Sequence, residues 1–263
     1  MTQHYNAPAQ RGEYLERKRF FDKMLTIYGR KPVLEALEDH NLPCYRLHLA
    51  ESNQTGGIIA QIMKLAEARG VEIKFHSRQA LSRISRNGKQ DQGVAADLAC
   101  PNHLLLEDFL AKPPANNYSL IALDGITNPQ NLGMIIRSVT ASPCHGLLLP
   151  AQGIAAISPL VIKASAGTLF KSRLIHCDNL AEALEALKQR GATCCALSSH
   201  GENTLTDFRP QTPVVYVLGN ETEGVSKTVN NCCTTHLRIP MHNGVESLNV
   251  AVTAALLAFR EFC

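Results

Sequence analysis

The sequence has no long hydrophobic run and no marked excess of charge of either sign. Its longest nearly apolar stretch, residues 249–259, is about half of the roughly 20 residues that a helix needs to cross a bilayer. The N-terminal stretch lacks the apolar segment of a secretory signal and contains Glu13 and Glu16, which a transit peptide avoids. The formal net charge of +3 excludes a histone-like polycation and an acidic tail. We therefore expect a soluble, cytoplasmic protein.

Cysteine spacings that make disulfide scaffolds or zinc sites are also missing. The nine cysteines are odd in number, none falls in a C-x-x-C pattern, and Cys194–Cys195 and Cys232–Cys233 are adjacent pairs. Because Cys194 and Cys195 lie inside an apolar run typical of a strand, we expect small, buried, hydrophobic side chains there. The ten histidines are scattered without a cysteine or carboxylate at ligand spacing, so we expect no metal site.

The motifs of several large enzyme classes are absent. The sequence contains no G-x-x-x-x-G-K-[ST] and no G-x-G-x-x-G, so nucleoside triphosphate binding by a P-loop and ordinary Rossmann dinucleotide binding lose support. It contains no G-x-S-x-G elbow, which argues against an α/β-hydrolase. Any catalytic site must therefore be sought in other loops.

The length allows one large domain or two small ones, at roughly 150 residues per domain. Charge divides unevenly along the chain. Residues 1–98 carry 15 Lys and Arg against 11 Asp and Glu, net +4, whereas residues 99–263 carry 11 against 12, net −1. Residues 99–118 contain three prolines and mark a linker. We expect a flexible arm at 1–23, a first domain at 24–98, a linker at 99–118 and a second domain at 119–263.

Helices and strands are expected to alternate in both domains, which indicates an α/β protein. In the second domain the apolar strand runs do not alternate with polar residues, so we expect a parallel sheet that helices cover on both faces. In such sheets ligands bind beyond the carboxyl ends of the strands. The expected strands of this domain are 118–124, 145–150, 172–176, 192–198, 213–219 and 236–240, and the expected helices are 131–142, 158–170, 178–191, 224–232 and 247–262.

A first polar loop follows the strand at 118–124 and leads into a helix. The helix has Leu132, Ile135, Ile136 and Val139 at i, i+3, i+4 and i+7, which predicts one buried face. Asn131 is placed to cap it, so that the free N–H groups of the first turn face the loop and favour an anion. Arg137 lies off the buried face and adds a guanidinium suited to phosphate. A capping asparagine and a solvated arginine are the alternative.

Two further polar loops follow strands. Residues 219–226 (GNETEGVS) place two acids, Glu221 and Glu223, between glycines that let the backbone approach a ligand; a tight turn with Ser226 capping the next helix is the alternative. Residues 239–249 (IPMHNGVESLN) lead into the last helix, which Ser247 or Asn249 can cap. Both loops are more polar than a connection of their length requires.

The first domain carries a basic cluster. Four cations fall within 78–89 with no acid between them, which is the electrostatic pattern of a phosphate-binding surface; a solvated helix face is the alternative. Arg30 extends this candidate surface. The cluster consists of Arg78, Arg83, Arg86 and Lys89.

Taken in order, LDGITNPQNLGMIIRS, VLGNETEGVS and IPMHNGVESLNVAV resemble the three motifs of the SpoU/TrmH family of RNA 2'-O-ribose methyltransferases, within the SPOUT superfamily. The resemblance covers residues 119–263. Residues 27–98 are similar to the small α/β substrate-binding domain, like certain ribosomal proteins, that precedes the catalytic domain in many members; IYGRKPVLEAL and QGVAA carry this match. Relatives often have His before Q-G, where this chain has Asp91.

The resemblance implies a fold, a cofactor and partners. The fold is a parallel sheet with a trefoil knot, which ordinary folding rules would not predict. The cofactor is S-adenosylmethionine, and the protein is a homodimer. The partner is RNA, with ribosomal RNA preferred over transfer RNA because of the added N-terminal domain; transfer RNA methylation and a non-catalytic RNA-binding or ribosome-assembly role are the alternatives.

The resemblance also assigns residues. It implies a catalytic set of Asn131, Arg137, Glu221, Ser247 and Asn249, a cofactor pocket of Leu218, Gly219, Asn220, Ile239, Met241, Ser247 and Leu248, and RNA contacts by Arg30, Arg78, Arg83, Arg86, Lys89 and Arg137. A ribose 2'-hydroxyl is a weak nucleophile, so it must be oriented in line and lose its proton. Arg137 suits phosphate anchoring and hydroxyl orientation better than general-base catalysis, because arginine has a pKa above about 12.

Overall fold

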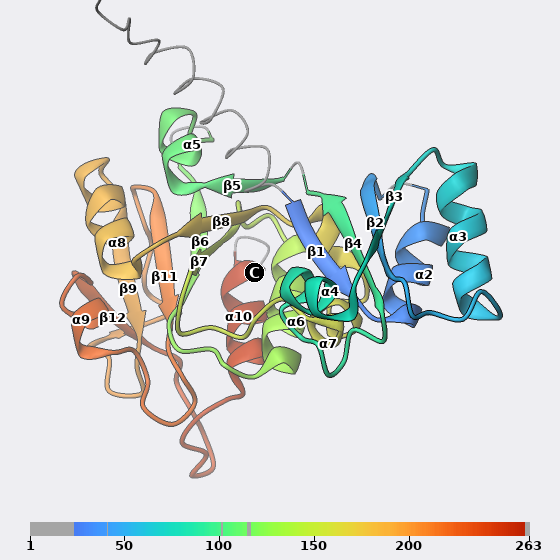
Figure 1. The fold of residues 1–263 in the computed structure, drawn as a ribbon. Coiled ribbons are helices and arrows are strands. Elements are labelled where there is room, and N and C mark those ends of the chain that lie inside the picture. Colours follow the sequence, from blue (N-terminus) through green and yellow to red (C-terminus); the bar gives the residue numbers. More distant parts are fainter. Residues whose placement is uncertain (1–23, 41, 101, 115–116, 261–263) are drawn as a thin grey trace, which may run out of the picture. The chain divides into compact units, whose positions relative to one another are not determined.

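A computed structural model of the chain describes residues 24–40, 42–100, 102–114 and 117–260 (Figure 1). The chain divides into two compact units, Met1–Pro101 and Asn102–Cys263, which we call the N-terminal and C-terminal units. The arm expected at residues 1–23 lies outside the described residues. None of the helices within these ranges is long and apolar enough to cross a membrane.

The N-terminal unit is built on a four-stranded sheet in the order β1-β4-β2-β3. Strand β4 is antiparallel to β1 and β2, whereas β2 and β3 are parallel. The elements are β1 (Met24–Tyr28), α2 (Arg30–Glu38), β2 (Cys44–Ala50), α3 (Ile58–Ala68), β3 (Glu72–His76), α4 (Arg78–Ser85) and β4 (Val94–Ala99).

Helices of this unit pack through the apolar faces that the sequence predicts. Helices α2 and α3 contact each other, and Val33, Ile59 and Ile62 on them are buried. Helix α4 packs through Leu81 in a cluster that includes Tyr28 of β1 and the buried alanines of β2 and β4. The alternation of helices and strands that the sequence predicts for the first domain is confirmed.

The C-terminal unit contains an eight-stranded sheet in the order β10-β12-β9-β11-β6-β7-β8-β5, and every neighbouring pair is parallel. Its strands are β5 (His103–Leu105), β6 (Ser119–Leu123), β7 (Leu147–Pro150), β8 (Leu174–Cys177), β9 (Thr193–Leu197), β10 (Asn203–Thr204), β11 (Val214–Leu218) and β12 (Thr235–Arg238). Its helices are α5 (Leu106–Ala111), α6 (Pro129–Thr140), α7 (Pro159–Ala164), the 3-10 turn η1 (Thr168–Lys171), α8 (Leu180–Gln189), α9 (Lys227–Asn230) and α10 (Val250–Ala258).

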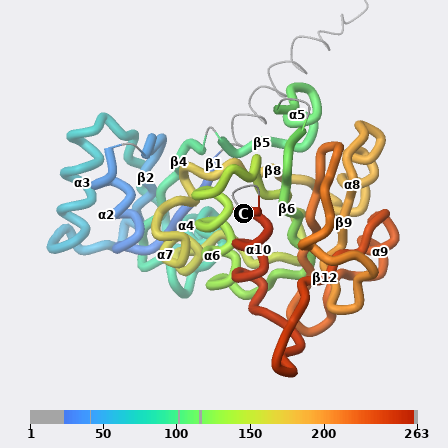
Figure 2. The backbone as a smooth tube through the Cα atoms, turned by 180° about the vertical axis from the view of Figure 1, so that it is seen from behind, coloured from blue at the N-terminus to red at the C-terminus, as the bar shows by residue number. Residues whose placement is uncertain are grey.

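Helices cover both faces of this sheet, as the apolar strand runs predict. On one face α5, α8 and α9 contribute Phe109, Leu184 and Val229 to a core with Ala122 of β6 and Val217 of β11. On the other face α10 contacts β6, β11 and α6, and α6 packs on α7. Figures 1 and 2 show α10 beside α6 from opposite sides. The fold class is therefore confirmed as α/β with a parallel sheet.

The segment expected to be a linker contributes to the C-terminal unit. Residues 103–105 form β5, which pairs with β8 at the edge of the sheet, and α5 buries Phe109 in the core. Three prolines gave residues 99–118 the composition of a linker, but the run HLLLEDFLA between them is apolar enough to be packed. The boundary between the compact units falls after Pro101.

The cysteines inside the strand run are small buried side chains, as expected. Cys194 and Cys195 are fully buried, and burial raises the pKa of each thiol to about 12. The eight cysteines within the described ranges are all free thiols.

Candidate active site

The three polar loops meet at one edge of the C-terminal sheet. The first follows β6, the second follows the adjacent strand β11, and the third follows β12, with β9 between β11 and β12. Because all these strands are parallel, their carboxyl ends share one edge, where α/β proteins bind ligands. The fold therefore brings together segments that are far apart in the sequence.

Hydrogen bonds hold the first loop against the second. The carboxylate Oδ2 of Asp124 accepts from the backbone N–H of Ser226 at 2.7 Å, and the side-chain amide of Asn220 donates to the carbonyl of Gly125 at 3.2 Å. The backbone N–H of Asp124 donates to the carbonyl of Leu218 at 2.8 Å, which extends the β6–β11 pairing by one bond. The two loops thus form one rigid surface.

The second loop requires a glycine at its start. Asn220 and Gly224 exchange backbone hydrogen bonds of 3.1 and 2.9 Å, which close the loop into a tight turn. A Cβ atom on Gly219 would lie 2.1 Å from the carbonyl carbon of Gly224 and 2.2 Å from the nitrogen of Val225. No side chain fits at position 219, and the turn presents Glu221 to solvent.

The N-cap of helix α6 lies three residues earlier than the sequence predicts. Its N-cap is Asn128, whose side-chain oxygen accepts from the backbone N–H groups of Gln130 at 2.8 Å and Asn131 at 3.3 Å, and Pro129 occupies the first position. The expectation that Asn131 caps the helix is therefore wrong. The dipeptide Asn-Pro is the signal for this start, because proline is favoured at the first helical position. The side chain of Asn131 is thereby left for another role.

A chain of hydrogen bonds joins one residue from each loop. The Nδ2 of Asn131 donates to the carboxylate Oε1 of Glu221, and the Oδ1 of Asn131 accepts from Asn249 Nδ2 at 3.1 Å. Asn249 is the N-cap of α10, where its Oδ1 accepts from the backbone N–H of Ala251 at 2.8 Å.

Only one orientation of each amide satisfies these contacts. A carboxylate only accepts, so the NH2 group of Asn131 faces Glu221, and the capping bond leaves only the NH2 group of Asn249 for Asn131. In this chain of hydrogen bonds both amide NH2 groups therefore donate in the direction of the Glu221 carboxylate, and the bonds polarise one another. Asn131 is buried, with 7% of its surface exposed, so it is the anchored centre of the chain.

The third loop carries backbone groups that the protein does not use. Among the N–H groups of residues 241–248, only that of Val245 donates to an acceptor in the described part of the chain, the carbonyl of His242 at 3.2 Å. Unpaired backbone N–H groups near an apolar surface need water or a ligand. This loop therefore offers a run of hydrogen-bond donors beside the strand ends.

Two residues of the expected catalytic set lie outside the hydrogen-bonded chain. Arg137 is exposed in the last turn of α6, about 9 Å along the helix axis from Asn131 at 1.5 Å per residue, so it does not adjoin the free N–H groups of the first turn. Ser247 is exposed in the third loop. Neither side chain bonds to a described residue.

The residues expected to line a cofactor pocket lie along the same edge. Leu218 is buried at the end of β11, whereas Ile239, Met241 and Leu248 are half-buried in the third loop. Gly219 and Asn220 are half-buried at the start of the second loop. Half-exposed apolar side chains next to free backbone donors suit a ligand that has both an apolar body and polar groups.

The basic cluster of the N-terminal unit is partly neutralised. Asp91 is fully buried and accepts from Ser85 Oγ at 2.9 Å and from the backbone N–H of Gly93 at 2.9 Å, and its carboxylate forms an ion pair with Arg78 at 3.1 Å. Arg78 thus fixes the loop that follows α4. Asp91 is therefore a structural anchor of this loop.

The remaining cations of this surface differ in whether they bond to other described residues. Arg83, Arg86 and Lys89 are exposed and form no ion pair with any described residue. Arg86 ends α4 in the left-handed conformation at φ 54°. The Nε of Arg30 donates to the carbonyl of Gln92 at 3.2 Å, which ties it to the loop after α4.

Asp124 and Asn128 are the residues that sequence reasoning missed. Both act through the backbone, since Asp124 fixes the second loop and Asn128 starts α6. The signal for Asp124 is an acid directly after a buried strand that is followed by glycine. The signal for Asn128 is the proline after it.

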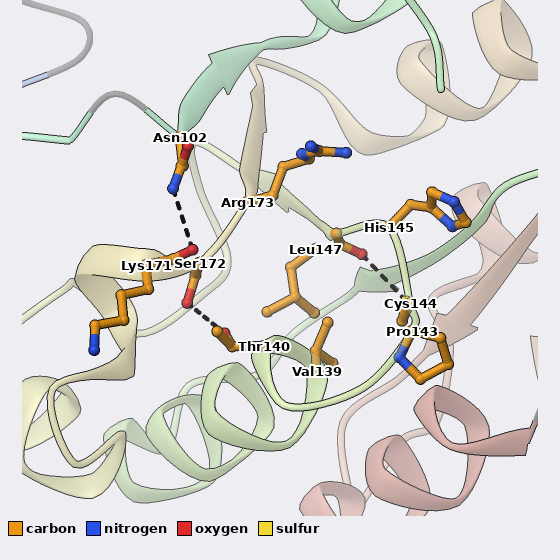
Figure 3. A pocket seen from close by; sticks show the side chains of 11 residues that line it. Asn102, Val139, Thr140, Pro143, Cys144, His145, Leu147, Lys171, Ser172 and Arg173 are labelled. Carbon is orange, nitrogen blue, oxygen red and sulfur yellow. Dashed lines mark hydrogen bonds between the residues drawn. The ribbon is translucent and has the colours of Figure 1, made fainter. Parts of the chain in front are cut away.

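A cavity of about 290 Å³ in this unit lies elsewhere, between the end of α6 and the starts of β7 and β8 (Figure 3). It contains none of the candidate active-site residues. This cavity is therefore distinct from the candidate active site.

Comparison with known protein families covers both units. Residues 118–259 match the sequence model of the family described as "SpoU rRNA Methylase family". Residues 26–103 match the one described as "RNA 2'-O ribose methyltransferase substrate binding".

Individual proteins agree with these matches. A protein of Mycolicibacterium vanbaalenii named "Uncharacterized tRNA/rRNA methyltransferase" is 33% identical over 88% of this chain and 74% of its own length. The crystal structure of the SpoU methyltransferase AviRb from Streptomyces viridochromogenes with AdoMet has a TM-score of 0.62 at 23% identity, covering 97% of this chain and 96% of AviRb, which shows a shared fold. A structure titled "Structural insights into the 2-OH methylation of C/U34 on tRNA" has a TM-score of 0.50 at 30% identity, over 56% of this chain and 95% of that one.

Proposed function

This chain belongs to the SpoU methyltransferase family, and on that premise we propose that it transfers a methyl group from S-adenosylmethionine to a ribose 2'-hydroxyl of RNA. The observation that carries the proposal is the hydrogen-bonded chain Glu221–Asn131–Asn249. It ties the three loops whose residues resemble the family motifs into one site at the carboxyl edge of the sheet. The position of methylation is supported by the match of the N-terminal unit to a 2'-O ribose substrate-binding family.

The residues at this edge fit the cofactor. Leu218, Ile239, Met241 and Leu248 offer apolar surface, and the free N–H groups of the third loop offer donors for polar atoms. The absence of a side chain at Gly219 lets the backbone of the second loop approach closely. When bound, S-adenosylmethionine supplies a methyl group activated by a sulfonium.

Arg137 is the residue that we assign to the RNA side of the reaction. Its guanidinium is exposed and has no partner in the described chain, so both edges of its fork are available to a phosphate next to the target ribose. Binding that phosphate would orient the hydroxyl in line with the methyl group, and orientation alone supplies a large part of such a rate enhancement. An orienting role fits this exposed guanidinium better than general-base catalysis, because arginine holds its proton tightly.

Ribosomal RNA is the substrate class that we prefer. The added N-terminal unit, with Arg83, Arg86 and Lys89 exposed, offers a second candidate RNA-binding surface besides the catalytic loops. The tRNA-related structure, by contrast, matches only 56% of this chain. Mapping 2'-O-methyl groups in total RNA with and without the gene identifies the target; loss of a site in transfer RNA alone would contradict the preference.

We also propose a homodimer that uses the outer face of α6, α7 and α10. Four large apolar side chains on these helices remain exposed, Met134, Leu160, Val252 and Leu256. The helix α10 has the sequence VAVTAALLA, with a single polar residue, and helices that are apolar all round are normally buried. A second copy of the same face would cover these side chains.

Replacing Arg137 by alanine tests the proposed chemistry. We expect methyl transfer to purified RNA to fall by about 100-fold or more, because the target hydroxyl is no longer oriented, with the affinity for S-adenosylmethionine changed only a few-fold. Transfer is measured with radiolabelled cofactor and affinity by calorimetry. Arg209→Ala, which removes an exposed arginine outside the three loops, is the matched control. Near-normal turnover of the Arg137 variant would eliminate the assigned role, and failure of the wild type to bind the cofactor would favour the non-catalytic alternative.

A further inference from the structure

The cavity of about 290 Å³ lies at the amino edge of the C-terminal sheet, opposite to the three loops. Leu147, the first residue of β7, lines it, and so does Arg173, which directly precedes β8. Val139 and Thr140 at the end of α6 complete one wall. From Asn131 to Thr140 the helix rises about 14 Å at 1.5 Å per residue, so the cavity and the candidate active site are at the two ends of α6.

The lining of this cavity is basic. Lys171, Arg173 and His145 line it, and no lining residue is acidic. Lys171 and Arg173 are exposed and, within the described ranges, neither forms an ion pair or a side-chain hydrogen bond. The Nδ1 of His145 accepts from the backbone N–H of Ser119 at 3.2 Å, so the proton of the neutral ring is on Nε2 and remains available as a donor.

The backbone that carries these side chains is fixed. The carbonyl of Arg173 accepts from the N–H of Leu147 at 3.0 Å, and a Cβ on Gly146 would lie 2.9 Å from the same oxygen. The side-chain amide of Asn102 donates to the carbonyl of Lys171 at 3.2 Å. In Figure 3 the side chain of Arg173 extends toward the side of the view where His145 lies, whereas Lys171 extends in another direction.

The carboxyl end of α6, which carries the negative pole of the helix dipole, forms one wall of the cavity, so the basic side chains have to outweigh it. The carbonyl of Val139 in this wall accepts from Ser142 Oγ at 2.8 Å. Thr140 Oγ1 and Ser172 Oγ lie 2.6 Å apart and share a hydrogen bond, and each is also within hydrogen-bond distance of a carbonyl, that of Ile136 at 2.6 Å and that of Thr168 at 2.9 Å. The hydroxyl protons of the wall are therefore used within the protein. The donors that remain for a ligand are the two exposed cations and the Nε2–H of His145.

We propose that this cavity binds a phosphate of the RNA backbone, as a second contact of the C-terminal unit remote from the methyl-transfer loops. A guanidinium and an imidazole N–H on the same side of the cavity, with a further cation in its lining and no acid, suit a phosphate group. The exposure of Lys171 and Arg173 suits a polymer that passes over the cavity better than an enclosed small molecule. The identification of the polymer as RNA rests on the proposed function, whereas the affinity for phosphate rests on the cavity alone.

The variant Arg173→Ala tests this contact by RNA binding, independently of methylation. With a single-stranded RNA oligonucleotide of mixed sequence, we expect the affinity to fall several-fold and the slope of log K against log salt to decrease by about 0.7, the value for one lost phosphate contact. Arg173→Lys should keep most of the slope because it keeps the charge. Lys112→Ala is the matched control, since it removes an exposed cation of the same unit that does not line the cavity.

Two further measurements separate the possible outcomes. Calorimetry with S-adenosylmethionine should give the wild-type affinity for Arg173→Ala, because the candidate active site is at the other end of α6. Inorganic phosphate titrated against the NMR signals of His145 should shift them, and RNA should displace it. A salt slope for Arg173→Ala equal to that of Lys112→Ala overturns the proposal. If phosphate binds but RNA does not displace it, the cavity still binds phosphate and only its assignment to RNA is overturned. RNA that binds through Arg173 without being methylated contradicts the proposed function and leaves this contact standing.

Discussion

At the scale of single residues, Asn131 has both polar atoms of its amide engaged, one by each neighbouring loop. Its NH2 group faces a carboxylate and its oxygen faces the capping residue of α10. Neither partner can be guessed from spacing, because Glu221 and Asn249 are 90 and 118 residues away. The family resemblance places the three residues in one site, but only the fold shows that they contact one another.

Replacing Asn131 by aspartate should make the stability of the protein depend on pH in a distinctive way. At neutral pH two carboxylates would face each other, which raises the pKa of one of them above its value in the unfolded chain. The penalty, about 1–3 kcal/mol by analogy with a broken buried hydrogen bond, should shrink as the pH falls and that carboxylate takes up a proton. Urea unfolding at neutral and acidic pH measures this. Asn117→Asp, at an exposed position, should show no such recovery, and an equal loss at both pH values in the Asn131 variant would refute the like-charge explanation.

His103 of β5 is a second residue with a predicted pH signature. Its ring is 4% exposed and packs 5.4 Å from that of His176, and Nε2 has no hydrogen-bond partner in the described chain. Burial lowers the pKa of His103 from 6.5 to about 4, and the charge on His176 adds to this effect. Between these values the unfolded chain binds a proton that the folded chain does not, so stability is lost as the pH falls.

The variant His103→Phe should remove this dependence. We expect the wild type to lose about 2 kcal/mol more than the variant between pH 7 and pH 5, since the unfolded histidine is protonated at pH 5 and the folded one is not. Urea unfolding at the two pH values is the measurement. His200→Phe replaces an exposed histidine and should retain the wild-type pH dependence. Parallel losses in wild type and His103→Phe would show that His103 is not the group responsible.

At the scale of elements, the buried faces follow from the sequence, whereas the ends of elements depend on local side-chain bonds. Leu132, Ile135, Ile136 and Val139 are all buried, as their spacing predicts. The observed start of α6 differs from the predicted one because Asn128, and not Asn131, caps the helix. The strand β5 was hidden in a segment that looks like a linker, because its pairing with β8 is a long-range interaction that composition does not reveal.

The contact between α6 and α7 is set by one glycine. A Cβ on Gly133 would lie 2.5 Å from the Cβ of Ala164 and 2.7 Å from the carbonyl oxygen of Val161. Gly133→Ala should therefore destabilise the protein by about 1–3 kcal/mol, even though alanine favours a helix by about 1 kcal/mol over glycine, because a backbone oxygen cannot move aside.

Activity should fall with Gly133→Ala as well, since Asn131 is two residues away on the same helix. Thermal unfolding and methyl transfer measure the two effects. The double variant Gly133→Ala/Ala164→Gly should recover only part of the stability, because the clash with the Val161 carbonyl stays. Gly56→Ala, with nothing within 4 Å of its Cβ, should be nearly neutral. A Gly133 variant as stable as the wild type would mean that α6 and α7 can separate freely.

At the scale of the whole molecule, the division of charge along the sequence matches the division into compact units. The excess of basic residues falls before residue 99, and the boundary between the units falls after Pro101. The order of the strands, by contrast, cannot be read from the sequence. It depends on crossovers that cover the whole unit, so neither the order β12-β9-β11-β6 nor a knot follows from periodicity. The knot remains an expectation from the resemblance.

The proposed dimer is tested by placing a charge on its expected interface. Leu256→Glu puts a carboxylate on the exposed apolar face of α10, and a buried unpaired charge should separate the two copies. Sedimentation should give a dimer for the wild type and a monomer for the variant, with circular dichroism unchanged. Phe75→Glu, which alters an equally exposed apolar residue of the N-terminal unit, should stay dimeric. A dimeric Leu256→Glu variant would place the interface elsewhere.

The parallel order of the large sheet also has a consequence for how the chain acquires its fold. The central strand β6 pairs with β7 nearby, but its other neighbour is β11, with Ser119 opposite Val214. During synthesis on a ribosome, β6 therefore emerges long before β11 exists. The edge of β6 that will pair with β11 stays unpaired until then. Pairings at such sequence separation make folding slow and leave strand edges exposed meanwhile. Assembly of the candidate active site is thus a late event, because two of its three loops follow β11 and β12, which are synthesised long after β6.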